Sequence, residues 1–210
     1  MTEQLEARHV APLPTSLWPE ELQGVVRDMN GKPIHVHQLM ANNPTLLNAW
    51  WNFRNHSVDG GTLGKRLGEL VILRVSVHMQ AWYEWGSHVD RGLRCGLTQQ
   101  DILRVLDYNL DENWSNKDAS LLRAVDELIV NHGLSPEVGQ RISQHLSTAQ
   151  IMDVIAIQGM YVILACMINT WGLALDNHVA KAIEGITDET SFKDAAAKFA
   201  KEKLVNLQVE

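Results

Sequence analysis

Apolar residues recur at helical spacing along most of the chain, whereas the alternation of apolar and polar positions that is typical of strands is scarce. The segment 63–79 is the clearest example, with Leu63, Leu67, Leu70, Val71 and Val77 on one helical face. We find no internal repeat and no low-complexity tract. The pattern therefore predicts an all-α protein.

Proline, glycine and short polar residues mark where these helices begin and end. The segment after Ser16, with Pro19 in its first turn, predicts one helix that continues to about Met29. Asn43-Pro44 ends a short helix over 34–43 and begins the next one. Three further signals are the glycine that closes 81–95 (Gly96), the N-cap of the helix that follows (Thr98), and an N-cap followed by proline at N1 (Ser135-Pro136).

The segment 154–168 is apolar on nearly every side. It is shorter than the roughly 20 residues that a membrane span needs, and it carries Gln158 between Asp153 and Asn169. A helix of this kind is buried in a large core or between subunits. We therefore expect a homo-oligomer and no contact with membranes. The last segment, 187–210, predicts a charged helix on the surface or on a neighbouring subunit.

Composition narrows the class of protein. The chain has 210 residues, of which 45% are hydrophobic and 20% charged, as expected for one large domain or two small ones. Its formal net charge is −7, its pI is about 5.7 and it has no basic run, so we expect no nucleic-acid partner. The start has no basic segment followed by an apolar one, which favours a cytoplasmic protein. The two cysteines, Cys95 and Cys166, are far apart and predict neither a dithiol redox site nor a zinc knuckle.

An acid and an imidazole stand one helical turn apart, at Glu84 and His88, among Trp82, Tyr83 and Trp85. Side chains at i and i+4 share a helix face, so this pair can move a proton near neutral pH or can be a half-buried structural pair. The three aromatic residues can line an apolar substrate pocket or belong to the core.

Glu69 stands in an apolar run of the preceding helix. A buried carboxylate is costly unless it is paired, hydrogen-bonded or protonated. Alternatively, Glu69 lies on the polar edge of the helix and forms an ion pair with Lys65 or Arg74.

The sequence gives little support for a metal site, a nucleophilic serine or a nucleotide cofactor. His78, Glu84 and His88 do not share one helix face, so we expect no metal. His35 and His37 are two positions apart, and such residues on a helix do not face each other. The chain lacks the nucleophile-elbow, dinucleotide and P-loop glycine motifs, and we expect no cofactor.

The stretch from Gly68 to Ile102 resembles the core of the carboxymuconolactone decarboxylase and alkylhydroperoxidase D-like superfamily. The peroxidase branch of that superfamily carries a glutamate, eleven residues, C-x-x-C, three residues and a histidine. The glutamate and histidine match Glu69 and His88, whereas Ala81 and Glu84 stand at the two cysteine positions. The sequence from Tyr83 to His88 resembles the carboxymuconolactone decarboxylase-like branch. Gln158, Tyr161 and Asn169 are consistent with its longer members.

The resemblance implies an alkylhydroperoxidase D-like helical domain over 43–186, with an N-terminal extension (1–42) and a C-terminal charged helix (187–210). It also implies a trimer or hexamer, with a site between helices near a subunit interface. The implied catalytic residues are His88 as the general acid–base, Glu84 as a group that tunes or orients it or as a second acid–base group, and Glu69 as the residue that completes the relay or holds His88. Trp82, Tyr83 and Trp85 are the implied substrate-binding residues, with Tyr83 as a hydrogen-bond donor.

The function that follows is a cofactor-independent acid–base enzyme, a lyase or hydrolase, acting on a small organic acid or lactone by decarboxylation, lactone opening or isomerisation. One alternative is a non-catalytic oligomer that binds a small ligand. A second is alkylhydroperoxidase-type activity, which the missing cysteine pair disfavours. Four arginines are candidates for binding a substrate carboxylate, and the sequence does not choose among them: Arg54, Arg66, Arg74 and Arg91.

Overall fold

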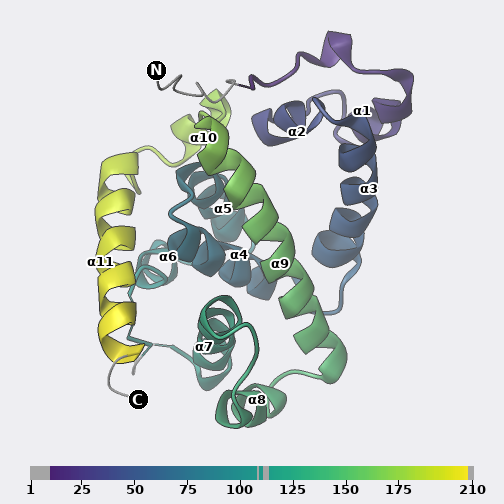
Figure 1. Cartoon of the computed structure of the whole chain (residues 1–210). Coiled ribbons are helices and arrows are strands. Elements are labelled where there is room, and N and C mark those ends of the chain that lie inside the picture. Colours follow the sequence, from purple (N-terminus) through teal and green to yellow (C-terminus); the bar gives the residue numbers. More distant parts are fainter. Residues whose placement is uncertain (1–9, 108, 111–113, 208–210) are drawn as a thin grey trace, which may run out of the picture.

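A computed structural model describes residues 10–107, 109–110 and 114–207, and within these ranges every regular element is helical (Figure 1). The all-α prediction is confirmed. The helices are α1 (Gln23–Asp28), α2 (His35–Met40), α3 (Pro44–Arg54), α4 (Lys65–Met79), α5 (Trp82–Arg94), α6 (Gln99–Arg104), α7 (Asn116–Val130), α8 (Pro136–Ser143), α9 (Thr148–Trp171), α10 (Asn177–Ala182) and α11 (Glu189–Leu207). Two 3₁₀ turns, η1 (Thr15–Leu17) and η2 (Glu20–Leu22), and one π-helical segment, η3 (Asn55–Gly60), complete the described part of the chain.

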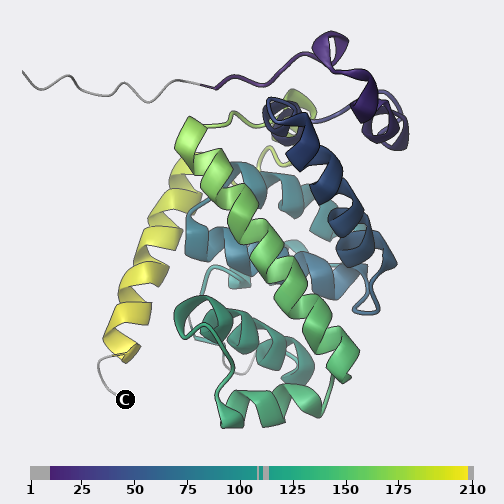
Figure 2. The same ribbon diagram turned by 45° about the vertical axis from the view of Figure 1, so that its right-hand side comes forward.

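Helix α4 lies at the centre of the fold. It packs against α5, α7 and α9, and all of its residues from Leu67 to Val77 are buried. The N-terminal helices α1–α3 and the C-terminal α11 lie on opposite sides of this central group in both views (Figures 1 and 2). The buried part of α4 includes Glu69, Arg74 and Ser76, and each of these side chains needs a polar partner in the core.

Most of the predicted helix boundaries are confirmed. Thr98 caps α6 and Ser135 caps α8, each accepting a hydrogen bond from a backbone N–H in the first turn, and Pro136 is the first residue of α8. Gly96 lies just beyond α5 with φ +94°, a conformation that favours glycine.

The prediction of one helix from Ser16 to Met29 is wrong. Pro19 interrupts it, because the residue before a proline avoids the helical region, and Trp18 is indeed extended (ψ 135°). The segment forms η1, η2 and the short α1 instead.

Helix α9 is the long apolar helix, and by length and composition alone it could cross a membrane. One side of it, including Tyr161, Leu164 and Ile168, is buried against the core. Its other side leaves Met152, Ile155 and Ile163 exposed.

Helix α11 packs against α4 and α5 of its own chain. Phe192, Ala196 and Phe199 are buried at this contact, so its apolar residues are covered without a neighbouring subunit. Residues 208–210 of the predicted C-terminal helix and the first nine residues of the predicted N-terminal extension lie outside the described ranges.

Candidate active site

Helices α4 and α5 bring Glu69 and His88 together. His88 Nδ1 lies 2.6 Å from Glu69 Oε2, and both side chains are buried. Glu69 is therefore paired with an imidazole, and the alternative of an ion pair to Lys65 or Arg74 is not what the structure shows. Because Nδ1 is engaged, Nε2 of His88 is the ring nitrogen that can exchange a proton with a substrate.

Burial lowers the pKa of His88 below its ordinary value of 6.5. The Glu69 carboxylate acts in the opposite direction, and the charges of Arg91 and Arg54 lower the pKa further. His88 is consequently neutral at physiological pH and able to accept a proton there.

A small cavity of about 50 Å³, here called the inner chamber, lies beside this pair. Its wall comes from α2, α3, α5 and α9 together with the segment that precedes α2. The polar and aromatic lining residues are His37, Trp50, Trp51, Arg54, Tyr83, Glu84, Ser87, His88, Arg91 and Tyr161. Tyr161 meets the His88 ring edge-on, with ring centroids 5.0 Å apart.

Glu84 lines the inner chamber, and among the described residues it forms no hydrogen bond with His88. Neither of its carboxylate oxygens has a hydrogen-bond partner there, and the side chain is 2% exposed. Burial raises its pKa well above the ordinary value of 4.5, which favours the neutral carboxylic acid. Of the two glutamates, Glu69 and not Glu84 forms the hydrogen bond to His88.

Trp82 and Trp85, expected to bind substrate, do not line the inner chamber. Trp85 is fully buried and stacks on Phe192 of α11 at 5.1 Å between ring centroids, and Trp82 also contacts Phe192. The reason is helical geometry, because positions 82, 85 and 89 share one face of α5 while 84, 88 and 91 share another.

Tyr83 lines the inner chamber, but its hydroxyl is already engaged. It donates to Asp176 Oδ2 at 2.6 Å and accepts from the backbone N–H of Val36 at 3.2 Å. The same carboxylate accepts from the N–H of His35. Tyr83 and Asp176 therefore hold the start of α2, and the hydroxyl expected to donate to a substrate is engaged with Asp176 here.

A larger cavity of about 310 Å³, here called the outer chamber, is lined by Glu69. Arg54 and Arg91 line both chambers. Arg54 forms an ion pair with Asp59 and lies over the Trp51 ring, whereas Arg91 is half-buried on the same face of α5 as His88. Two guanidinium groups that line both cavities can bind an anionic group.

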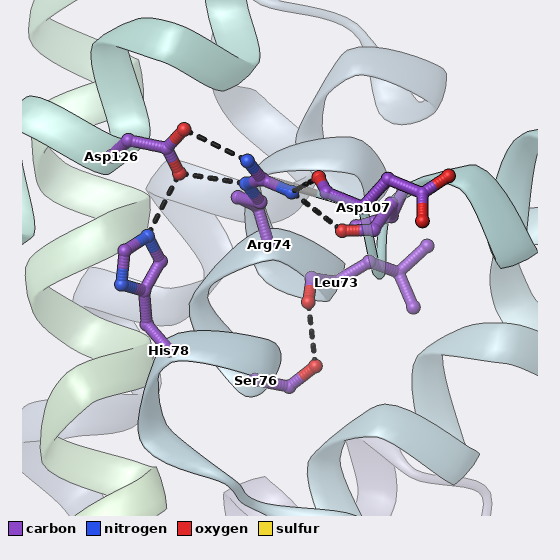
Figure 3. A network of polar contacts seen from close by, with 7 residues as sticks. Leu73, Arg74, Ser76, His78, Asp107 and Asp126 are labelled. Atoms are coloured by element: carbon purple, nitrogen blue, oxygen red, sulfur yellow. Dashed lines mark hydrogen bonds and ion pairs between the residues drawn. The ribbon is translucent and has the colours of Figure 1, made fainter. Parts of the chain in front are cut away.

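The other two candidate arginines are committed elsewhere. Arg66 makes a two-pronged ion pair with Asp118. Arg74 binds Asp126 with two nitrogens and the carbonyls of Val105 and Asp107 with a third (Figure 3). Both lie away from the chambers, so only Arg54 and Arg91 remain of the four.

The Arg74 network is a buried structural assembly that also involves His78 (Figure 3). His78 Nε2 lies 2.8 Å from Asp126 Oδ1, and α11 covers the group with Phe199, whose ring centroid lies 4.4 Å from the Arg74 guanidinium carbon. Burial acts to raise the pKa of Asp126, but the charge and hydrogen bonds of Arg74 outweigh it and bring the pKa to about 2. Asp126 is therefore ionised throughout the physiological range.

Sequence reasoning did not assign His37 to the site. Its ring packs against Trp50 and Trp51, with centroids 5.6 and 5.3 Å away. Burial, followed by the charges of Arg91 and Arg54, lowers its pKa to about 3. The one available signal was a histidine among apolar residues in a short helix. In the described residues no three His, Cys, Asp or Glu side chains gather to hold a metal ion.

Comparisons with known proteins agree with this fold. Among solved structures, a variant of the debrominase Bmp8 in complex with 2,3,4-tribromopyrrole is similar, with a TM-score of 0.71 at 15% identity, covering 85% of this chain and 97% of that one. A peroxidase-related protein from Ralstonia eutropha JMP134, described as an alkylhydroperoxidase AhpD core, gives 0.71 at 16% identity with the same coverage. One from Silicibacter sp. TM1040 gives 0.69 at 17% identity, again with that coverage. At these identities the likeness shows a shared fold. No curated protein matches the chain significantly.

The sequence also matches a family model. Residues 44–127 match the model of the carboxymuconolactone decarboxylase family, and this range includes Glu69, Glu84, His88, Arg54 and Arg91. His37, Tyr161 and Asp176 lie outside it. Residues 44–127, in a chain with the alkylhydroperoxidase D-like helical fold, therefore belong to the carboxymuconolactone decarboxylase-like superfamily.

Proposed function

We propose that this protein is a cofactor-independent acid–base enzyme acting on a small organic acid or lactone. The observation that carries the proposal is the buried contact of 2.6 Å between His88 and Glu69, at a cavity that two arginines also line. A neutral imidazole held by a carboxylate is a general base, and its protonated form is a general acid.

Each residue has a distinct role in this proposal. Arg54 and Arg91 bind the anionic group of the substrate and orient it. His88 takes a proton from the substrate through Nε2, and Glu69 stabilises the imidazolium that forms. His88 then returns the proton to the product. Decarboxylation, lactone opening and isomerisation each use such transfers.

Two neighbours in fold are described as peroxidase-related, but a dithiol peroxidase mechanism is disfavoured here. Ala81 and Glu84 occupy the positions where that branch has its cysteines. Cys95 lines the outer chamber, but burial raises the pKa of its thiol and the charge of Glu69 raises it further. A thiolate nucleophile needs the opposite shift.

The test is a panel of lactones, β-keto acids and carboxylated enol lactones, assayed with the wild-type protein and with the His88→Ala and Glu69→Gln variants. We expect turnover of at least one compound and its loss in His88→Ala. Turnover that is unchanged from the wild type in both variants contradicts the proposal. Ligand binding without turnover of any compound supports the non-catalytic alternative.

We further propose that the protein is a homo-oligomer, as a trimer or hexamer. The exposed apolar residues Met152, Ile155 and Ile163 of α9 are available for the subunit contact. Light scattering coupled to gel filtration tests this. A mass of one chain, about 24 kDa, rules the assembly out.

A further inference from the structure

The inner chamber is bordered by polar atoms that lack hydrogen-bond partners among the described residues. They are both carboxyl oxygens of Glu84, Nδ1 of His37, Oγ of Ser87 and Nε1 of Trp50. Leaving a buried polar group unpaired is costly, so native proteins rarely gather several of them without a ligand or water to bind. This cluster therefore indicates a binding site for a polar group.

The chemistry of these atoms specifies the group that fits. At neutral pH the Glu84 carboxyl, the His37 ring, the Ser87 hydroxyl and the Trp50 indole are all uncharged and can each donate a proton to a hydrogen bond. The nearby positive charges come from Arg54 and Arg91, and they lower the pKa values of both His37 and His88. Neutral donors beside two guanidinium groups suit an oxygen that carries partial or full negative charge.

We propose that Glu84 and His37 form a hydrogen-bonding pair that binds the carbonyl oxygen of the substrate and stabilises the negative charge that develops on it. This deepens the proposed function and rests on it. When His88 removes a proton from the carbon next to the carbonyl, the C–H electron pair moves toward the oxygen, and an enolate forms. When His88 returns the proton to carbon, the carbonyl is restored. The substrate class is then a carbonyl compound with an acidic C–H bond and an anionic group.

A neutral carboxylic acid is well suited to this role. An ionised Glu84 would repel the developing oxyanion, whereas the protonated form donates a hydrogen bond to it. His37 likewise acts as a donor and not as a base, since its pKa of about 3 leaves it uncharged at neutral pH. The other titratable groups that line the chamber are Arg54, Tyr83, His88, Arg91 and Tyr161.

His37 comes from the N-terminal segment, outside residues 44–127. The start of α2 is held by the hydroxyl of Tyr83 and the carboxylate of Asp176, which contact the backbone N–H groups of Val36 and His35. The N-terminal segment therefore has a specific task, which is to close the inner chamber and supply one member of the proposed pair of donors.

A direct test uses 4-nitrophenol, whose phenolate mimics an enolate oxygen and absorbs visible light. The wild-type protein is titrated with it at several pH values, and the affinity for the phenolate and the apparent pKa of the bound phenol are measured. We expect the bound phenol to ionise at lower pH than the free phenol. His37→Phe and Glu84→Leu should each weaken phenolate binding about tenfold, as for the loss of one hydrogen bond to a charged oxygen.

Two conservative variants and one control make the test specific. His37→Asn and Glu84→Gln keep a donor, so they should retain most of the affinity if they fold as the wild type does by circular dichroism. His178→Asn, at an exposed histidine of α10, should behave as the wild type.

The proposal is overturned if the wild-type protein does not bind the phenolate, or if both apolar variants bind it within twofold of the wild type. The outcome is separate from that of the proposed function. Phenolate binding that depends on His37 and Glu84, without turnover of any compound, leaves this pair in place and removes the catalytic role of His88. Turnover that depends on His88, together with phenolate binding that neither His37 nor Glu84 affects, supports the proposed function and overturns the role of this pair.

Discussion

The imidazole of His88 and the carboxylate of Glu69 meet at 2.6 Å across the interface of two helices, nineteen positions apart in the sequence. The contact satisfies a carboxylate that would otherwise be buried without a partner in α4. It also fixes which nitrogen of His88 remains for a substrate. Structure and proposed chemistry therefore depend on the same hydrogen bond.

Removing either partner of this pair should affect turnover differently. His88→Ala should lower kcat about 10²- to 10⁴-fold, because it removes the general base. Glu69→Gln should cause a smaller loss and should move the acidic limb of the pH–rate profile to lower pH, because the Glu69 carboxylate raises the pKa of His88. The measurement is kcat/KM against pH, and an acidic limb that does not move in Glu69→Gln contradicts the assigned partnership.

Replacing Glu84 by leucine should stabilise the fold while impairing the site. Glu84→Leu removes a buried carboxyl without a partner and should raise the free energy of unfolding by about 1 to 3 kcal/mol. Urea denaturation of the two proteins at neutral pH measures this difference. A less stable Glu84→Leu variant would show that the carboxyl has a structural partner.

The stability gained in Glu84→Leu should also depend on pH. The pKa of Glu84 is raised in the folded state, so between 4.5 and the folded pKa the folded protein binds a proton that the unfolded chain has lost. Wild-type stability therefore decreases with rising pH in this range relative to Glu84→Leu. Unfolding free energies of both proteins at pH 4, 5.5 and 7 should diverge, and a constant difference would mean that folding does not raise the pKa of Glu84.

Arg74 should be among the most sensitive positions in the core. Arg74→Met leaves Asp126 as a buried charge with fewer partners and should cost about 3 to 5 kcal/mol of stability. Adding Asp126→Leu should recover part of this loss. Arg66→Met, in which a partly exposed ion pair is broken, is the matched control and should cost less. Equal losses in the two single variants would argue against the central role of the Arg74 network.

Tyr83→Phe separates a positioning role from a substrate contact. The variant leaves Asp176 and the N–H of Val36 short of one hydrogen bond each, so it should lower the free energy of unfolding by about 1 to 3 kcal/mol. Chemical denaturation together with kcat and KM measures the two effects. A raised KM with unchanged stability would favour a direct contact of the Tyr83 hydroxyl with the substrate.

The double variant Cys95→Ser and Cys166→Ser should retain the turnover of the wild type. The thiol of Cys95 has a raised pKa, which disfavours the thiolate, and Cys166 is exposed on α9 and lines neither chamber. Assays of acid–base turnover and of peroxide reduction on the same preparations check this. A large loss of peroxide reduction in the variant would revive thiol chemistry for this protein.

Local patterns in the sequence were enough to predict the helices and most of their ends. Helical spacing of apolar residues predicted α4, and the side chains of Thr98 and Ser135 predicted the start of α6 and α8, because an N-cap acts within one turn of chain. The helix predicted through Pro19 does not form, because a proline keeps the residue before it out of the helical region.

The spacing from Glu69 to His88 also pointed to the site, but which partner His88 binds was decided by the packing of α4 against α5. Spacing on one helix tells which residues share a face, and it favoured Glu84 as readily as Glu69. It does not tell which helix that face meets. For this reason only the tertiary structure showed that Trp82 and Trp85 pack against α11 and that the Tyr83 hydroxyl binds Asp176. It also showed that His37, from the N-terminal segment, lines the inner chamber.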